Sequence, residues 1–390
     1  MVDLCKRAGV TALIIIFTFL FAFSSNAEEP LDISAHSAIL MVADTGEIIY
    51  EKNSNEKMPM ASTTKIMSSI IALECGKSEQ LLKISSDMVN IEGTSMGLMP
   101  DDVISVKTLV CGMLLESGND AANAVAYAVA GSTENFVKLM NDKAKEIEMT
   151  STHFVTPSGL DEKEHYSTAR DMALLGAYAI KNPEFKHICS QKEMTVCFGN
   201  PPFKRKISNH NRLLSNCEGV FGIKTGFTKK SGRCLVSAAK RDGINLIAVT
   251  LNAPNDWNDH SKMFDYGFSV IHKNLLDLDV STLKIKVVGS DKKEIQVATH
   301  FEYFYPYLNL SAVPVKDIFI SKFIYAPVKT GDVVGYIRYS VNNKTLFETP
   351  IIATEDAICV TKENAVQSRK GFLEKIKEKI VKGLKGENND

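Results

Sequence analysis

The chain has 390 residues, and its 45 lysines and arginines nearly balance 46 aspartates and glutamates, giving a net charge of −1. This length predicts two or three domains, and the balanced charge excludes the strongly basic footprint of a nucleic-acid-binding protein. No glycine-rich phosphate loop, His-x-x-x-His pair or Cys-x-x-Cys pair occurs, so we expect neither a cofactor nor a metal.

The N-terminal segment has the pattern of an export signal. Lys6 and Arg7 precede an apolar run at about 10–23, and small residues up to Ala27 precede two glutamates. This order predicts a secretory signal peptide over residues 1–27, and therefore a location outside the cytoplasm. An uncleaved membrane anchor is the alternative, although the apolar run is short for a full span.

The cysteines do not indicate a disulfide-stabilised protein. Of the 8 in the chain, Cys5 lies in the signal segment, and the remaining odd number is irregularly spaced. Cys75 and Cys111 lie in helix-like apolar stretches and are expected to be small core residues. The spacing leaves open a bond between Cys189 and Cys197.

The next part of the chain alternates between strand and helix patterns. Residues 36–51 alternate around a turn and predict a two-stranded hairpin. Ser167 is expected to cap a helix that runs to Ile180. The other predicted elements are helices at about 62–75, 106–116, 121–130, 133–148 and 261–271, and strands at 219–227, 233–239 and 244–251. We therefore expect an α+β domain over residues 28–275, whose sheet brings the first hairpin beside the late strands.

The C-terminal part of the chain has a different pattern. Short β-rich pieces separated by turns predict a small all-β domain over residues 276–362. The tail, residues 363–390, has apolar residues at helical spacing, and its segment 369–385 carries seven Lys/Arg and two Glu. This pattern predicts a basic amphipathic helix that lies on an anionic membrane. A solvated tail is the alternative.

A serine and a lysine lie at the start of the first predicted helix. Ser62 and Lys65 are one turn apart on one face if a helix starts after Pro59. The hydroxyl is then near the positive end of the helix dipole, and burial lowers the pKa of a lysine so that it can act as a base. Ser-x-x-Lys occurs five times in the chain, so this pair has meaning only in its context.

Two further tripeptides supply that context. Ser117-Gly118-Asn119 places a hydroxyl and a carboxamide at the mouth of a helix, and Lys224-Thr225-Gly226 places a charge and a hydroxyl on a strand. Each tripeptide alone is weak evidence, because Lys-Thr-Gly recurs at 329–331. The order Ser-x-x-Lys, Ser-x-Asn, Lys-Thr-Gly is much more specific and is a signature of serine β-lactamases and penicillin-binding proteins.

With these motifs, residues 28–275 resemble the low-molecular-mass penicillin-binding proteins, the serine-type D-alanyl-D-alanine carboxypeptidases of peptidase family S11. Segments such as 42–46, 159–161 and 166–173 also look like that family. The resemblance implies a β-lactamase/transpeptidase-like antiparallel sheet flanked by helices, with a helical subdomain, a β-rich stalk and a C-terminal amphipathic membrane anchor. Residues 329–331 then fall in the stalk as a turn.

The resemblance also implies catalytic roles for individual residues. Ser62 is implied as the nucleophile and Lys65 as its general base. Ser117 is expected to relay a proton toward the leaving amine or from the incoming water. Asn119 is expected to hold the substrate amide and to orient Lys65.

The third motif is implied to bind substrate. Lys224 and Thr225 are expected to bind the terminal carboxylate, and Gly226 lets the substrate backbone approach. The backbone N–H groups of Ser62 and Phe227 are expected to form the oxyanion hole. Because like charges disfavour double protonation, Lys224 is also expected to help keep the general base neutral.

Two features depart from the family pattern. Some members have a histidine where this chain has Phe227, and some place an arginine on the next strand, whereas residues 246–252 contain none. His153, Asp161 and Arg170 are expected to brace a loop and not to take part in chemistry.

The implied substrate is a peptidoglycan stem peptide ending in D-Ala-D-Ala, and β-lactam antibiotics are implied as acylating ligands. The implied place of action is the outer face of the cytoplasmic membrane, bound through residues 369–385. The motifs also leave open a β-lactamase, although Glu162 and Glu164 are not in its usual Glu-x-x-Leu-Asn context. They leave open a DD-endopeptidase or transpeptidase as well, and a non-catalytic wall-binding protein.

Overall fold

The computed structural model describes residues 31–299, 303–308, 314–341 and 344–360, together with Glu374 and Lys377. The expected signal peptide lies outside these residues, as does the expected amphipathic tail except for those two positions. No helix within the described residues is long and apolar enough to cross a membrane.

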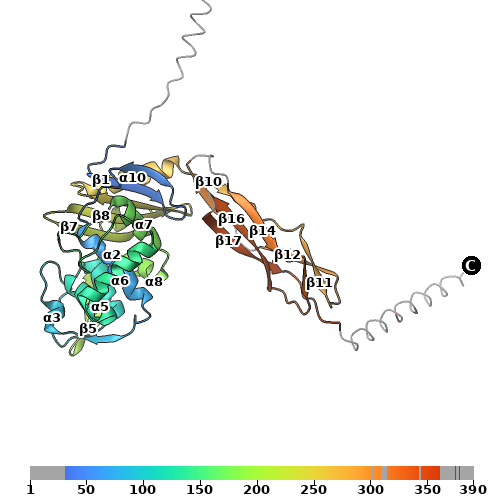
Figure 1. Cartoon of the computed structure of the whole chain (residues 1–390), viewed down its shortest axis with the longest axis horizontal. Helices are drawn as coiled ribbons and strands as arrows, with labels where there is room; N and C mark the ends of the chain where they lie inside the picture. The colour runs from blue at the N-terminus through green and yellow to red at the C-terminus, as the bar shows by residue number, and fades with distance from the viewer. Residues whose placement is uncertain are drawn as a thin grey trace, which may run out of the picture.

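The first domain is built on a five-stranded antiparallel sheet with the strand order β2-β1-β9-β8-β7. The hairpin from the start of the chain therefore lies beside the late strands, as the sequence predicts (Figure 1). The strands are β1 Ser37–Val42, β2 Ile48–Lys52, β7 Val220–Thr228, β8 Gly232–Arg241 and β9 Ile244–Leu251.

Alternating residues of this sheet enter two different hydrophobic cores. Ile39 and Met41 of β1 join the core beneath the helical block, which includes α7 (Ala169–Ala179). Leu40 of β1 belongs to the core under α10 (Asp256–Val270). This alternation is what the two-residue period of a strand dictates for a sheet covered on both faces, and it places α10 on the face opposite to α7.

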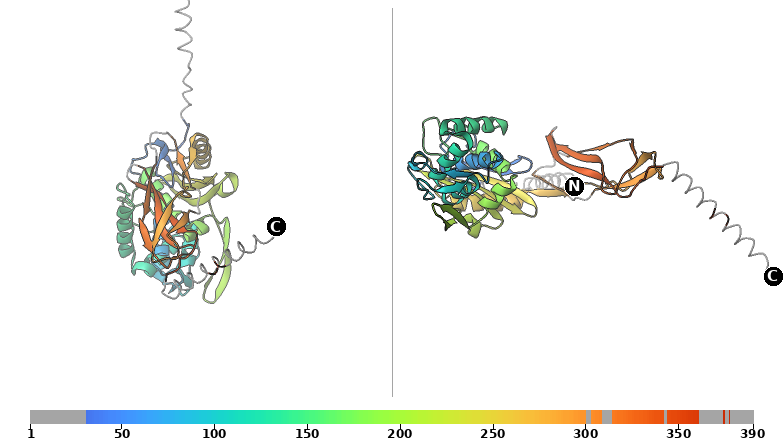
Figure 2. Two further views of the ribbon diagram at one scale, coloured as in Figure 1. Left: turned by 90° about the vertical axis from the view of Figure 1, so that its right-hand side faces the viewer. Right: turned by 90° about the horizontal axis from the view of Figure 1, so that it is seen from below.

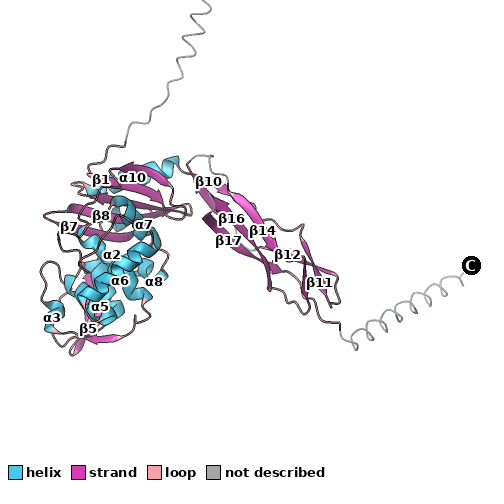
Figure 3. Ribbon diagram, in the orientation of Figure 1, coloured by secondary structure: helices cyan, strands magenta, loops and turns pink. Residues whose placement is uncertain are grey.

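A helical block and a small four-stranded sheet complete the first domain (Figure 3). Its helices and helical turns are η1 Ala61–Thr64, α2 Lys65–Glu74, α3 Ser86–Val89, α4 Val106–Cys111, η2 Gly112–Glu116, α5 Asn119–Ala130, α6 Thr133–Glu146, α8 Pro183–Cys189 and α9 Leu213–Asn216. The small sheet, of order β3-β4-β5-β6, consists of β3 Leu81–Lys83, β4 Val103–Ser105, β5 Glu193–Gly199 and β6 Pro202–Ser208.

The first helix begins later than the sequence predicts. Ala61 has a φ of 49°, and residues 61–64 form a 3-10 turn before the α-helix begins at Lys65. Ser62 therefore lies in that turn, and its side chain does not cap the helix.

Two other predicted helix starts are also wrong. The cap of α7 is Thr168, whose side chain accepts a hydrogen bond from the Asp171 backbone, whereas the Ser167 hydroxyl lies 2.7 Å from the Thr152 hydroxyl. The last helix of the domain, α10, begins at Asp256 and not near residue 261, because polar residues in its first turn mask the helical period.

The C-terminal part of the chain forms a β-rich domain, as predicted, which extends away from the first domain (Figure 2). Its main sheet has the order β14-β16-β17-β12-β11-β15, and β10 pairs with β13. The strands are β10 His272–Leu275, β11 Lys284–Val288, β12 Glu294–Ala298, β13 Phe304–Tyr307, β14 Val315–Ile320, β15 Phe323–Tyr325, β16 Val333–Val341 and β17 Lys344–Ala353.

Six of the described cysteines, Cys75, Cys111, Cys189, Cys197, Cys217 and Cys234, are free thiols. Cys111 is buried, as expected, and Cys75 is half-buried. The possible bond between Cys189 and Cys197 does not form, since the first is buried against Gly222 and the second is exposed.

Candidate active site

Ser62 and Lys65 are in direct contact. The Nζ atom of Lys65 lies 2.9 Å from the Ser62 hydroxyl oxygen, although the two residues belong to different helical turns. The same Nζ donates to Asn119 Oδ1 and to the Ser158 carbonyl, at 2.7 Å each. Lys65 is fully buried, so two acceptors and one hydroxyl hold its amine in place.

Burial controls the charge of this amine. Desolvation lowers the pKa of Lys65 well below its usual value, the nearby Lys224 lowers it further, and Asp120 opposes them. Burial also lowers the pKa of Lys224 to about 7. Two ammonium groups in one dry site disfavour each other, so the pair resists holding two protons.

The second motif is held by the loop in front of it. Ser117 has a φ of 62° between η2 and α5, and its carbonyl accepts a hydrogen bond from the Thr94 hydroxyl at 2.7 Å. Asn119 donates through its backbone to the Thr94 carbonyl and through Nδ2 to the Glu92 carbonyl, both at 2.7 Å. The Ser117 hydroxyl has no hydrogen bond to any described residue and faces the cleft.

The third motif runs along β7 and packs against the 3-10 turn Ala61–Thr64, which carries Ser62 and is called the serine turn below. A Cβ atom added to Gly226 would lie 3.1 Å from the Met60 carbonyl oxygen and from the Ser62 nitrogen. Only a glycine lets this strand approach so closely without displacing its neighbours. The Lys224 amine donates to the Thr225 carbonyl at 3.0 Å.

A cleft of about 530 Å³ opens beside these residues. Five of the eight residues that the sequence indicates lie in its wall: Ser62, Ser117, Thr225, Gly226 and Phe227. The other three, Lys65, Asn119 and Lys224, are buried behind it. The structure thus brings all three motifs to one place. Within the described residues, no group of three or more His, Cys, Asp or Glu is arranged to hold a metal ion.

The loop 156–165 covers the serine turn from the other side. A Cβ atom added to Gly159 would lie 1.9 Å from the Ala61 carbonyl oxygen. His165 lies 2.9 Å from the Thr64 hydroxyl and accepts a hydrogen bond from the Val155 backbone. Burial lowers the pKa of His165 to about 4, so this histidine is neutral and structural. No sequence pattern distinguishes it from the residues around it in the loop.

An arginine that the sequence did not indicate lies in the cleft wall. The strand next to β7 is β8 and not β9, so residues 246–252 belong to the wrong strand for an arginine near the carboxylate. Arg233 of β8 pairs with Phe227 and lines the cleft. The short turn between the strands at 228–232 could have revealed this pairing, since residues equally far from a hairpin turn face each other.

The other residues that line the cleft also lie outside the three motifs. They are Thr94, Asn209, His210, Arg212, Asp256 and Trp257. Burial lowers the pKa of His210, and Lys224 lowers it further.

The fold and the site together define a class of protein. A five-stranded antiparallel sheet with a helical block, and a buried lysine against a serine at the cleft between them, is the arrangement of penicillin-recognising serine enzymes.

Comparisons with known proteins identify the family. Residues 24–255 match the peptidase S11 family, D-alanyl-D-alanine carboxypeptidase, and residues 272–357 match the C-terminal domain of penicillin-binding protein 5. The chain belongs to the S11 family and is a serine-type D-alanyl-D-alanine carboxypeptidase with a C-terminal β-rich domain.

Individual relatives agree with this assignment. The chain is 34% identical over 370 residues to D-alanyl-D-alanine carboxypeptidase DacF of Bacillus subtilis, covering 90% of this chain and 94% of that protein. It is equally similar to DacC of Escherichia coli, with 90% of each chain covered. The solved structure of penicillin-binding protein 5 from Haemophilus influenzae superposes with a TM-score of 0.60 at 29% identity, covering 84% of this chain and 99% of that one.

Proposed function

We propose that Ser62 is the nucleophile that removes the terminal D-alanine from peptidoglycan stem peptides ending in D-alanyl-D-alanine, with Lys65 as its base. One observation carries this proposal. The two carbonyl oxygens that contact Lys65 Nζ, from Asn119 and Ser158, can only accept hydrogen bonds. A neutral amine has two N–H groups, so these acceptors use both and leave the lone pair for the Ser62 hydroxyl, 2.9 Å away.

In the acylation step, the Ser62 hydroxyl gives its proton to Lys65 as its oxygen attacks the carbonyl carbon of the penultimate D-alanine. The backbone N–H groups of Ser62 and Phe227 stabilise the oxyanion. The C–N bond then breaks, and the proton passes from the Lys65 ammonium through the Ser117 hydroxyl to the departing amine. The products are free D-alanine and an ester on Ser62. The Ser117 hydroxyl faces the cleft and has no hydrogen bond to a described residue, which suits such a relay.

Lys224, Thr225 and Arg233 bind the terminal carboxylate of the substrate. Thr225 and Arg233 lie on one face of the β7–β8 pair as diagonal neighbours, a separation that a long arginine side chain spans. The Thr225 hydroxyl has no hydrogen bond to a described residue and is open to a ligand. A β-lactam with a carboxylate beside its reactive carbonyl satisfies the same groups, so penicillins acylate Ser62.

Water completes the cycle. It gives a proton to Lys65 and attacks the ester carbon, and the Ser62–acyl bond breaks with return of the proton to the serine oxygen. Asn119 orients Lys65 through Oδ1 and retains one Nδ2 hydrogen, beyond the one given to Glu92, for the substrate amide. An amine in place of water would make the same ester a transpeptidase intermediate.

A β-lactamase function fits the site less well. That activity needs rapid deacylation, usually assisted by a glutamate on the loop between the second and third motifs. Glu162 and Glu164 are exposed on that loop, and neither lines the cleft. A slowly hydrolysed penicillin adduct is therefore expected.

The proposed domains match this role. Residues 1–27 export the chain, 28–275 form the enzyme, 276–362 form a stalk, and 363–390 lie on the outer face of the cell membrane. Binding to anionic vesicles tests the last assignment: deletion of 363–390 should abolish the binding of the mature protein, and unchanged binding would reject it.

The intact mass of the mature protein after incubation with a penicillin tests the whole proposal. One adduct that maps to Ser62 is expected, and Ser62→Ala should give none and release no D-alanine from a pentapeptide. If wild-type protein forms no adduct on Ser62, the proposed acyl-enzyme is rejected.

A further inference from the structure

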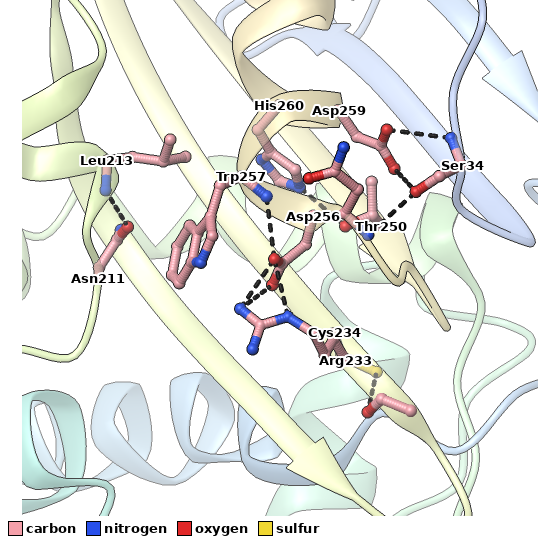
Figure 4. Close-up of polar contacts among 12 residues, drawn as sticks. Ser34, Asn211, Leu213, Arg233, Cys234, Thr250, Asp256, Trp257, Asp259 and His260 are labelled. Carbon is pink, nitrogen blue, oxygen red and sulfur yellow. Dashed lines mark hydrogen bonds and ion pairs between the residues drawn. The ribbon is translucent and has the colours of Figure 1, made fainter.

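A buried carboxylate lies in the cleft wall against Arg233. Asp256 is only 2% exposed, and its two oxygens accept hydrogen bonds from Nε and Nη2 of Arg233, at 2.9 Å each (Figure 4). The Trp257 ring lies under the guanidinium, with its centroid 5.2 Å from Cζ. Both residues open the first turn of α10 and line the cleft.

This carboxylate is surprising in a site that binds an anionic group. A negative charge close to the terminal carboxylate of a substrate repels it, and burial opposes ionisation of Asp256 by raising its pKa, although Arg233 lowers it again. Asp256 therefore does not attract the substrate by its charge. Its contacts indicate a different role, because they engage only the Nε and Nη2 side of Arg233. Nη1 has no hydrogen bond to any described residue and is open to a ligand.

The helix that carries Asp256 is itself fixed to the sheet. His260 bridges two strands, contacting the Ser237 hydroxyl of β8 with Nδ1 and the Thr250 hydroxyl of β9 with Nε2, the latter at 3.0 Å. Asp259 accepts hydrogen bonds from the hydroxyl of Ser34, at 2.8 Å, and from its backbone, at 3.0 Å. The His260 contacts thus hold α10 against β8 and β9, whereas Asp259 joins the helix to the segment before β1.

We propose that Asp256 is a positioning residue, which holds the Arg233 guanidinium in the orientation that binds the terminal carboxylate. This inference rests on the proposed function of the cleft. A free arginine loses side-chain entropy when it orders around a ligand, whereas the Asp256 contact and the Trp257 ring order Arg233 beforehand. The remaining N–H groups then present a planar donor edge that matches a carboxylate.

Coulomb's law alone and positioning predict opposite results for Asp256→Asn. Removing a negative charge strengthens carboxylate binding if charge is what matters. If placement matters, the same change weakens it, because an asparagine cannot accept both guanidinium hydrogen bonds. The sign of the effect therefore distinguishes the two explanations.

The experiment compares a synthetic peptide ending in D-alanyl-D-alanine with the same peptide carrying a C-terminal carboxamide. The ratio of kcat/KM values for acid and amide measures carboxylate recognition. Arg233→Gln should lower this ratio by about 10- to 100-fold, the value of a charge-assisted hydrogen bond. Asp256→Asn should lower it about tenfold through KM, as when a supporting partner of a binding group is removed. The double variant should match Arg233→Gln alone, since Asp256 acts through Arg233.

Asp259→Asn is the matched control, because this acid is equally buried in the same helical turn but contacts Ser34 and not the cleft. It should lower the Tm and leave the acid-to-amide ratio unchanged. Asp256→Glu keeps the charge but displaces it, and should also lower the acid-to-amide ratio. This second variant keeps the proposal testable if Asp256→Asn is too unstable to assay.

Three outcomes would overturn the proposal: a ratio that rises or stays constant in both Asp256 variants, an effect of Asp256→Asn that persists in the Arg233→Gln background, or an equal effect of Asp259→Asn. If Arg233→Gln leaves the ratio intact while penicillin still labels Ser62, Asp256 has no such role and the proposed acyl-enzyme stands. Absence of the label would reject the proposed function itself.

Discussion

Lys-Thr-Gly occurs twice in this chain, at 224–226 in the α+β domain and at 329–331 in the β-rich domain, and the two copies lie in opposite environments. Lys224 is 1% exposed and its pKa is lowered to about 7 by burial. Lys329 is exposed in a turn. The same three residues therefore form a binding strand in one place and a surface turn in the other.

The glycines and threonines of the two copies differ in the same way. Gly226 faces the serine turn, whereas Gly331 has a φ of 94° and no described residue within 4 Å of an added Cβ atom. The Thr330 hydroxyl donates to Asp356 at 2.8 Å, whereas that of Thr225 has no hydrogen bond to a described residue. Chemistry thus comes from what surrounds the tripeptide, and paired substitutions in the two copies test this directly.

The largest difference is expected for the lysines. Lys224→Met should lower kcat/KM for a D-alanyl-D-alanine peptide by about 10²- to 10³-fold, as for loss of one preorganised electrostatic group. Lys329→Met, the matched control, should leave kcat/KM unchanged. D-alanine release by the two variants measures both values. Equal losses would mean that the cleft is not where the carboxylate binds.

The glycines should separate activity from stability. Gly226→Ala should lower the rate of penicillin acylation by about tenfold to a hundredfold, because the new methyl displaces the serine turn and small misplacements are costly. Gly331→Ala should instead cost about 1 kcal/mol of unfolding free energy through its positive φ, with acylation unchanged. Stopped-flow acylation and chemical denaturation measure the two effects. A Gly226→Ala variant with the wild-type acylation rate would contradict the close approach of β7 to Ser62.

The sequence predicts the local parts of this arrangement well. Ser62 and Lys65 meet because they are three residues apart in a helical turn, and this holds even though the turn is 3-10 and not α-helical. The first hairpin and the three late strands are equally clear, because each strand shows an uninterrupted apolar run or alternation. The motif order then predicts the family.

Contacts between distant segments are not predictable in the same way. The Ser158 carbonyl that fixes Lys65 is a backbone group, so no side-chain pattern marks it. Arg233 is a different case: it lies only six residues from Phe227 across a hairpin, and it is missed because strand periodicity alone does not show that β8, and not β9, is the neighbour of β7. The hairpin β5–β6 is also missed, since Lys204, Arg205 and Lys206 on its exposed edge interrupt any alternation.

The pH dependence of activity should report the protonation of the two buried lysines, Lys65 and Lys224. Activity requires neutral Lys65 and protonated Lys224, so kcat/KM should rise with pH as Lys65 loses its proton. It should then fall about tenfold per pH unit once Lys224, with its pKa lowered to about 7, also loses its proton. In kcat the descending limb should lie at higher pH, because a bound carboxylate favours protonated Lys224.

The control for this profile is Lys224→Arg, whose guanidinium stays charged throughout. Whatever activity it retains should have no descending limb below about pH 10. A descending limb that persists at the same pH would assign it to a group other than Lys224.

The smallest difference is expected for the threonines. Thr225→Val removes one of three groups proposed to bind the carboxylate, so kcat/KM should fall only about fivefold to tenfold, the value of a single hydrogen bond. Thr330→Val should leave kcat/KM unchanged. It should lower the unfolding free energy by at most about 1 kcal/mol, because Asp356 is exposed and water replaces the lost hydrogen bond. The carboxamide peptide sharpens the test, because Thr225→Val should affect the acid more than the amide. Equal losses on both peptides would place the Thr225 hydroxyl on the peptide backbone of the substrate, and the carboxylate would then depend on Lys224 and Arg233 alone.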